Sequence, residues 1–243
     1  ATRRGILVIH VPDANITAMV EYTFMLMLAL ARNFGHPQVE DQLGFQLSGK
    51  NLGIIGFGRQ GREVATRAQA FGMHVLAYDP YIDLSFARQH GVEIVDLPEL
   101  LSRADIVTLH TAYTQQTHRM INAESLAQMK PGGYLINCIH TGLFDEAALL
   151  AALENGSLAG VALDIWDQQA TPISRALFQH PKVLGSQQLS QKSLEALANT
   201  STSIVTDLLA ALRGEDFRNI VNLPFGVQTP YQTVNHNIGF EFL

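Results

Sequence analysis

The stretch that decides the fold is LGIIGFGRQGREVATRAQAFG, residues 52–72. Within it, Gly56, Gly58 and Gly61 form the pattern G-x-G-x-x-G between an apolar run typical of a buried strand and a helical pattern. The first glycine of such a turn allows a tight bend, the second lets the backbone approach a pyrophosphate, and the third lets the helix pack closely on the strand. A lone match is weak evidence, so its interpretation depends on the next segment of the chain.

The next predicted strand ends in an acidic residue. HVLAYDP (74–80) places Asp79 at 23 positions after Gly56, where a carboxylate can accept hydrogen bonds from the ribose hydroxyls of an adenine dinucleotide. Asp79 also disfavours the 2′-phosphate of NADP, and Pro80 and Tyr81 supply no cation to offset it. The sequence therefore predicts NAD as the cofactor. A glycine-rich turn that binds nothing is the structural alternative.

Apolar segments typical of buried strands recur along the chain with helical patterns between them. Most are continuous apolar runs, as expected for strands covered on both faces. They are GILVIHV (5–11), NLGIIGF (51–57), HVLAYD (74–79), VEIVD (92–96), DIVTLHT (105–111), GYLINCI (133–139), LAGVALDI (158–165) and KVLGS (182–186). The pattern predicts an α/β fold, a doubly wound parallel sheet with helices on both faces. We expect one dinucleotide-binding domain over residues 1–222 and a C-terminal tail over residues 223–243.

Two helical segments carry informative patterns. DEAALLAALENG (145–156) opens with Asp145 and Glu146 and ends at Gly156, which predicts a helix with acidic residues at its start and a left-handed residue at its end. The segment 17–34 is apolar on nearly all sides, so its helix should be buried between domains or subunits. A homodimer contact is the sharper interpretation, and an ordinary core helix is the alternative.

Composition narrows the classes of partner. The net charge is −6 and the sixteen Lys and Arg are scattered, which argues against nucleic acid. The longest apolar run, residues 22–31, is about half of the roughly 20 residues that span a bilayer, so we predict no membrane association. A single cysteine excludes an internal disulfide and a cysteine-based zinc site, and the nine histidines lack metal-ligand spacing. We predict no metal and a cytoplasmic location.

Longer segments of the chain resemble the D-isomer-specific 2-hydroxyacid dehydrogenases. The resemblance rests on VPDANITAMVEYTFMLMLALAR, GKNLGIIGFGRQGREVATRAQAFGMHVLAYDP, LPELLSRADIVTLHTAYTQQTHRMIN, MKPGGYLINCIHTGLFDEAALLAALENGSLAGVALDIW and HPKVLGSQ, in that order. It implies two doubly wound domains with NAD between them, and hydride transfer to or from a 2-hydroxy or 2-oxo acid. It also implies that the N-terminal substrate domain is missing or truncated here.

The resemblance further implies a catalytic arginine, glutamate and histidine, and this chain has other residues at all three positions. His140 stands where the N-x-x-R-G pattern has arginine, Gln169 lies five residues after Asp164 where glutamate belongs, and Gln188 replaces the histidine of P-H-x-G. Asp164 itself matches the family's nicotinamide-side aspartate. The cofactor-binding residues we predict are Gly56, Gly58, Arg59, Gln60, Gly61, Asp79, His110, Cys138 and Asp164.

These substitutions weaken the expected chemistry. Arginine holds a carboxylate with a planar fork of donors, whereas imidazole offers one donor direction. An amide such as that of Gln188 has no acidic proton to give a ketone oxygen. We therefore expect an NAD(H)-binding protein with an impaired catalytic site and a binding or regulatory role. The alternative is an NAD-dependent oxidoreductase with a rebuilt site, in which His140 is the acid/base.

Three side chains near the predicted site have simpler interpretations. Cys138 is more readily explained as a buried packing thiol than as a nucleophile. For His110, at a predicted strand end, hydrogen bonding to backbone is the simpler expectation. His118 is expected at the surface.

Overall fold

The computed structural model describes residues 1–34, 43–82, 84–165, 171–215 and 219–222. The chain divides into two compact units, one from Ile16 to Ser193 and one that combines Ala1–Asn15 with the chain from Leu194 onward. The first unit is narrower than the 1–222 range expected for the dinucleotide-binding domain, whose functional limits stay a prediction. The expected tail, 223–243, lies outside the described residues.

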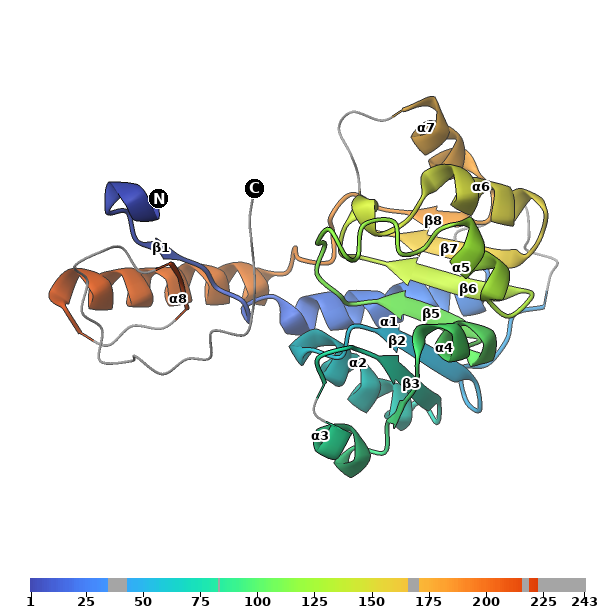
Figure 1. Cartoon of the computed structure of the whole chain (residues 1–243), viewed down its shortest axis with the longest axis horizontal. Coiled ribbons are helices and arrows are strands. Elements are labelled where there is room, and N and C mark those ends of the chain that lie inside the picture. Colours follow the sequence, from blue (N-terminus) through green and yellow to red (C-terminus); the bar gives the residue numbers. More distant parts are fainter. Residues whose placement is uncertain (35–42, 83, 166–170, 216–218, 223–243) are drawn as a thin grey trace. The chain divides into compact units, whose positions relative to one another are not determined.

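A seven-stranded parallel sheet forms the centre of the unit 16–193 (Figure 1). Its strands are β2 (Asn51–Ile55), β3 (His74–Tyr78), β4 (Glu93–Ile94), β5 (Ile106–Leu109), β6 (Gly133–Asn137), β7 (Leu158–Leu163) and β8 (Val183–Gly185). The spatial order is β4-β3-β2-β5-β6-β7-β8, and every neighbouring pair is parallel. The chain order reverses between β2 and β5, which makes their carboxyl ends the topological switch point.

Helices cover both faces of this sheet, which confirms the predicted doubly wound fold. On one face, α1 (Ile16–Ala31) and α2 (Arg59–Ala70) pack against each other and against β2, β3, β6 and β7. On the other, α4 (Leu97–Arg103), α5 (Ala123–Gln128), α6 (Glu146–Glu154) and α7 (Pro172–Gln179) form a continuous layer. The short α3 (Leu84–Gln89) lies beside β4. Each face has its own apolar core cluster, so the strands are buried on both sides, as their continuous apolar runs predict.

The residues predicted to begin and end the helix over 145–156 do so at α6. The Asp145 side chain accepts a hydrogen bond from the backbone N–H of Ala148, and Gly156 follows the helix with φ +78°. The first helix runs from Ile16 to Ala31, close to the predicted 17–34, and most of its apolar side chains are buried. Within the described ranges, no helix has both the length and the apolar character needed to cross a membrane.

The second unit corrects one strand prediction. It contains a short 3₁₀ turn (Thr2–Arg4), β1 (Val8–Ile9), α8 (Leu194–Arg213) and β9 (Ile220–Asn222). β1 pairs antiparallel with β9 in a two-stranded sheet, so GILVIHV does not join the parallel sheet. A strand inside the parallel sheet would be covered on both faces, but Val8 and Ile9 are only half-buried. They pair with a single strand, whereas the predicted strands of the large sheet are covered on both faces.

Candidate functional site

The carboxyl ends of the parallel strands bring the predicted site residues to one edge of the sheet. Each residue follows its strand directly or after a few residues, so neighbouring strands place them next to one another. They are Gly56 after β2, Asp79 after β3, His110 after β5, Cys138 and His140 after β6, Asp164 after β7 and Gln188 after β8. Gln169 lies outside the described residues.

The three glycines of the loop differ in what surrounds them. Gly56 has φ +94°, and a Cβ added to it would lie 2.5 Å from the backbone nitrogen of Thr111. A Cβ on Gly61 would collide with the carbonyl oxygen of Gly56, where α2 packs on the loop. Gly58 is the N-cap of α2, and a Cβ there would meet nothing within 4 Å. Open space at Gly58, beside the positive end of the helix, is what close approach of a pyrophosphate requires.

Asp79 is tied to the glycine loop. Its Oδ2 accepts a hydrogen bond from the backbone N–H of Phe57 (2.8 Å), and its Oδ1 accepts one from the backbone N–H of Tyr81 (2.9 Å). A carboxylate offers about four acceptor positions, so two remain after these bonds. The position and the remaining acceptors fit the ribose hydroxyls of a dinucleotide.

Two polar side-chain atoms at this edge have no partner. Gln60 Nε2, in the first turn of α2, and His110 Nδ1, after β5, are buried without a hydrogen bond to any described residue. Buried polar atoms are nearly always hydrogen-bonded in native proteins, so each exception calls for an explanation. Both atoms lie close to the switch point, one at the start of α2 and one just after β5, and a bound dinucleotide with its waters would supply partners. Arg59, the first residue of α2, adjoins Gly58.

His110 differs from its expected surroundings. Its Nε2 pairs with the side chain of Thr108 at 2.9 Å, not with backbone, and its Nδ1 is the unpartnered atom. Burial lowers the pKa of His110 to about 3, so the imidazole is neutral at physiological pH. A neutral ring with a free nitrogen can donate or accept a hydrogen bond, according to its tautomer.

His140 is exposed and caps a 3₁₀ turn, Thr141–Leu143. Its Nδ1 accepts a hydrogen bond from the backbone N–H of Gly142 at 2.9 Å. Because Nδ1 acts as the acceptor in this bond, Nε2 is the ring nitrogen left to donate a hydrogen bond. The side chain of Asn137 donates to the backbone carbonyl of His140 (3.0 Å) and accepts from the N–H of Ile139 (2.9 Å), which fixes the turn.

Tyr113 joins His140 in a cluster that sequence reasoning missed. The two rings stack with centroids 4.2 Å apart and planes 11° apart. The Tyr113 hydroxyl pairs with Nδ1 of His118 at 3.2 Å, and His118 is exposed, as expected. In the sequence, Tyr113 is only a tyrosine a few residues after a predicted strand end. That position does not predict its contact with a residue that follows another strand.

Cys138 is buried, with 4% of its surface exposed. Burial raises the pKa of its thiol to about 12, with a further contribution from the Asp164 carboxylate, while a hydrogen bond with Thr23 opposes the shift. A thiol held in this protonated form is a poor nucleophile. It packs in the core cluster on the α1 face, so a cofactor contact from Cys138 would have to come from its backbone.

Asp164 holds the loop that carries Gln188. Its Oδ1 accepts hydrogen bonds from the hydroxyl of Ser186 (2.6 Å) and the N–H of Leu189 (2.8 Å), and its Oδ2 accepts one from the N–H of Ser190 (2.7 Å). Asp164 is buried, and Gln188 adopts φ +51° between these anchors. Left-handed backbone in a residue other than glycine is uncommon and persists where the surroundings impose it. The predicted nicotinamide-side carboxylate thus shapes the loop at the predicted catalytic position.

No group of three or more His, Cys, Asp or Glu side chains that could hold a metal gathers in the described ranges. The parallel sheet, the glycine loop at its switch point and the carboxylate at the end of the next strand define a dinucleotide-binding domain of the Rossmann type.

Comparisons with known proteins give the family. Residues 24–187 match the D-isomer specific 2-hydroxyacid dehydrogenase, NAD binding domain. The chain is 36% identical over 254 residues to D-3-phosphoglycerate dehydrogenase of Bacillus subtilis, and 38% identical over 257 residues to that of Methanocaldococcus jannaschii. Each alignment covers 98% of this chain and 48% of the relative. The chain therefore spans about half the length of these relatives.

Solved structures agree with this assignment. D-lactate dehydrogenase from Aquifex aeolicus, complexed with NAD and lactic acid, superposes with a TM-score of 0.80 at 29% identity, covering 88% of this chain and 72% of that one. The NAD complex of a D-isomer specific 2-hydroxyacid dehydrogenase from Lactobacillus delbrueckii gives 0.81 at 28% identity, covering 89% and 73%. The chain belongs to the D-isomer specific 2-hydroxyacid dehydrogenase family, and NAD is the cofactor of its domain. That His140, Gln169 and Gln188 occupy the family's catalytic positions stays a prediction.

Proposed function

We propose that this protein binds NAD(H) without oxidising 2-hydroxy acids by its family's mechanism, and that it acts as a cofactor-dependent binding or regulatory protein. The observation that carries the proposal is Gln188, held at the predicted position of the catalytic histidine by a loop anchored on Asp164. Its amide cannot give a proton to a ketone oxygen. A positioned acid/base typically contributes about 10² to 10⁴ in rate.

His140 supports the same proposal. With Nδ1 engaged by Gly142, the ring has one N–H to offer, whereas a guanidinium offers a fork of donors to a carboxylate. Neither bidentate grip nor a fixed positive charge is available from this side chain in the arrangement described. A 2-oxo acid would therefore bind more weakly, and in a less defined orientation, than it would to a relative with arginine at this position.

The residues that would hold the cofactor are those whose surroundings fit it. Gly58 and the N-terminus of α2 would face the pyrophosphate, Asp79 the ribose, and Gln60 and His110 would supply the unpartnered polar atoms. When bound, NAD supplies the site at which a hydride is gained or lost. The protein's part in this proposal is to bind and orient it.

One observation favours a second function, an NAD-dependent oxidoreductase with a rebuilt site. The stack of His140 on Tyr113, and the hydrogen bond between the Tyr113 hydroxyl and His118, bring three ionisable side chains together beside the predicted site. For His140 to donate the proton, its ring would first have to take up a second proton and release the hydrogen bond from Gly142 to Nδ1. The substrate would be an atypical 2-hydroxy or 2-oxo acid, or another carbonyl compound.

Cofactor binding and turnover together separate the two functions. NADH is titrated by fluorescence, and its absorbance is then followed with phosphorylated and unphosphorylated 2-oxo acids, because the relatives include D-3-phosphoglycerate and D-lactate dehydrogenases. Binding without turnover is the expected result. Turnover that His140→Ala and Tyr113→Phe abolish, and His74→Ala at the opposite edge of the sheet leaves intact, would instead establish the rebuilt enzyme.

A homodimer through α1 and a cytoplasmic location complete the proposal. The exposed residues of α1 form one stripe, with Met25 and Leu28 (47% and 39% exposed) between Glu21 and Arg32. In an antiparallel pair of α1 helices related by a two-fold axis, Met25 meets Leu28 of the second copy and Glu21 meets Arg32. The stripe is thus complementary to itself in both charge and apolar character.

A further inference from the structure

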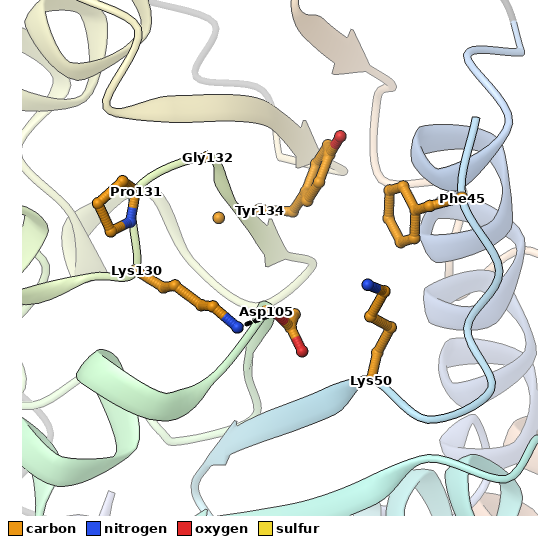
Figure 2. Close-up of a pocket in the computed structure, with 8 residues that line it drawn as sticks. Phe45, Lys50, Asp105, Lys130, Pro131, Gly132 and Tyr134 are labelled. Atoms are coloured by element: carbon orange, nitrogen blue, oxygen red, sulfur yellow. Dashed lines mark hydrogen bonds and ion pairs between the residues drawn. The ribbon is translucent and has the colours of Figure 1, made fainter. Parts of the chain in front are cut away.

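A cavity of about 200 Å³ lies at the edge of the sheet opposite the cofactor site. It is formed where β2, β5 and β6 begin, whereas the cofactor residues follow the ends of the same strands. Five strand residues separate the two edges by roughly 16 Å. Its walls are Phe45, Lys50, Asp105, Tyr134 and the turn 130–133 (Figure 2).

The floor of the cavity is fixed by hydrogen bonds. Asp105 accepts from Lys130 Nζ (2.5 Å) and from the backbone N–H of Asn51 (2.8 Å). Burial raises the pKa of Asp105, but the hydrogen bonds from Lys130 and Asn51 outweigh burial and leave the pKa below its usual value. The turn is fixed as well, because Gly133 donates to the carbonyl of Lys130 (2.8 Å). The Asp105–Lys130 pair therefore neutralises itself.

Lys50 brings a second positive charge that no described carboxylate pairs with. Its ammonium lies 6.0 Å from the centroid of the Phe45 ring, and no ion pair or hydrogen bond joins it to a residue in the described ranges. Figure 2 shows the ammonium directed into the space between Phe45 and Asp105, with a dashed line only between Lys130 and Asp105. The charge of Lys50 nevertheless acts on Asp105 at longer range, because it helps to lower the pKa of that carboxyl. The two lysines and Asp105 together leave one net positive charge facing the cavity.

The remaining walls are flat and largely apolar. The rings of Phe45 and Tyr134 have centroids 5.0 Å apart and planes at 37°, and Pro131 lies on another side of the cavity. Aromatic walls of this kind favour a planar partner. Ligand sites usually combine such walls with a few polar groups and occupy about 300 to 1,000 Å³, so this smaller cavity suits a ligand of a single ring.

Two helix ends limit the charge of that ligand. α4 ends at Arg103, two residues before Asp105, and α5 ends at Gln128, two residues before Lys130. Helix C-termini carry partial negative charge, which disfavours a phosphate dianion at this edge. A singly charged carboxylate matches the one net positive charge.

We propose that this cavity is a binding site for a small aromatic or heteroaromatic monocarboxylate, with the carboxylate on Lys50 and the ring against Phe45 and Tyr134. The site is independent of the cofactor site and of the chemistry proposed there. It gives the domain a second small-molecule ligand.

Benzoate is the probe that tests the site, titrated into the isotope-labelled 243-residue chain and followed by the amide resonances of Gly132, Gly133 and Tyr134. Saturable shifts at these amides are expected, and benzamide, which has the same shape without the charge, should bind at least about tenfold more weakly. Lys50→Gln should weaken benzoate by about the same factor, while Lys192→Gln, at another exposed lysine, should not. NADH binding by each variant reports folding separately.

Several outcomes would overturn the site. These are absence of saturable shifts up to the solubility limit of benzoate, equal affinity for benzamide, or equal affinity in Lys50→Gln. Displacement of benzoate by an equal concentration of inorganic phosphate would overturn the ligand class. The comparison of benzoate with benzamide uses the unaltered protein, so the test does not depend on any variant folding.

Discussion

The Oδ2 atom of Asp79 accepts a hydrogen bond from the backbone N–H of Phe57 at 2.8 Å, which joins the end of β3 to the glycine loop after β2. The carboxylate therefore shapes the loop, in addition to its predicted contact with the ribose. Its second oxygen, Oδ1, is engaged by Tyr81. Loss of the charge should alter both the loop and the cofactor contact.

Asp79→Asn should weaken NADH binding at least about tenfold, because the amide keeps one acceptor oxygen and presents an NH₂ group to donors. Fluorescence titration of NADH measures the effect. Asp96→Asn is the matched control, since Asp96 also accepts from a backbone N–H (Glu99, 2.8 Å) but caps α4. Equal NADH affinity in Asp79→Asn and the unaltered protein would remove Asp79 from the site.

Gly58→Ala should weaken NADH binding without affecting folding, whereas Gly61→Ala should lower the stability of the fold. A Cβ on Gly58 meets open space at φ −69°, so the variant should fold normally but lose NADH affinity, because the methyl group occupies the space of the pyrophosphate. A Cβ on Gly61 would meet the carbonyl oxygen of Gly56, so this variant should lose about 1–3 kcal/mol of stability.

Thermal unfolding and NADH titration of both glycine variants check this prediction. The informative result is the contrast between them. A Gly58→Ala protein that binds NADH as tightly as the unaltered one would place the pyrophosphate elsewhere.

His110 should make stability depend on pH. Burial lowers its pKa to about 3, whereas an unfolded histidine has a pKa near 6.5. Between these values the unfolded chain binds the extra proton, so stability falls as pH decreases from about 6.5 towards 3. From pH 7 to pH 5 the expected loss is about 2 kcal/mol.

Urea unfolding at pH 7 and pH 5 measures this loss. His110→Asn should reduce it by about the same amount. Thr108→Val, which removes the partner of Nε2 but keeps the ring buried, should retain it. An unchanged pH dependence in His110→Asn would show that the histidine is not the group responsible.

The sequence predicts most of the fold because its strongest signals are local. The glycine loop, the strand that ends at Asp79 and the helix that begins after Asp145 all depend on residues near one another in the chain. The N-terminal strand shows the limit of this approach. Its apolar run resembles those of the parallel sheet, but its partner is β9, more than 200 residues away, and composition does not encode that pairing.

The site is less predictable because its contacts join different strand ends. Their places at the ends of predicted strands predict that Asp79, His110, His140 and Gln188 lie at one edge of the sheet. They do not predict which hydrogen bonds these side chains make. The stack of Tyr113 on His140, and the anchoring of the Gln188 loop by Asp164, bring together loops after different strands. Such pairs have no spacing signature in the sequence.

The proposed dimer gives a charge-exchange prediction. Glu21→Arg should weaken self-association, because two arginines would then face each other at both ends of the antiparallel α1 pair, and Arg32→Glu should do the same with two glutamates. The double variant Glu21→Arg/Arg32→Glu restores opposite charges at both ends and should recover the dimer. Sedimentation velocity over a range of concentrations measures the association. Glu63→Arg, which reverses a charge on the exposed surface of α2 and breaks only the pair with Arg67, should leave it unchanged. A monomeric unaltered chain at high concentration, or a double variant no stronger than either single variant, would exclude this pairing of α1.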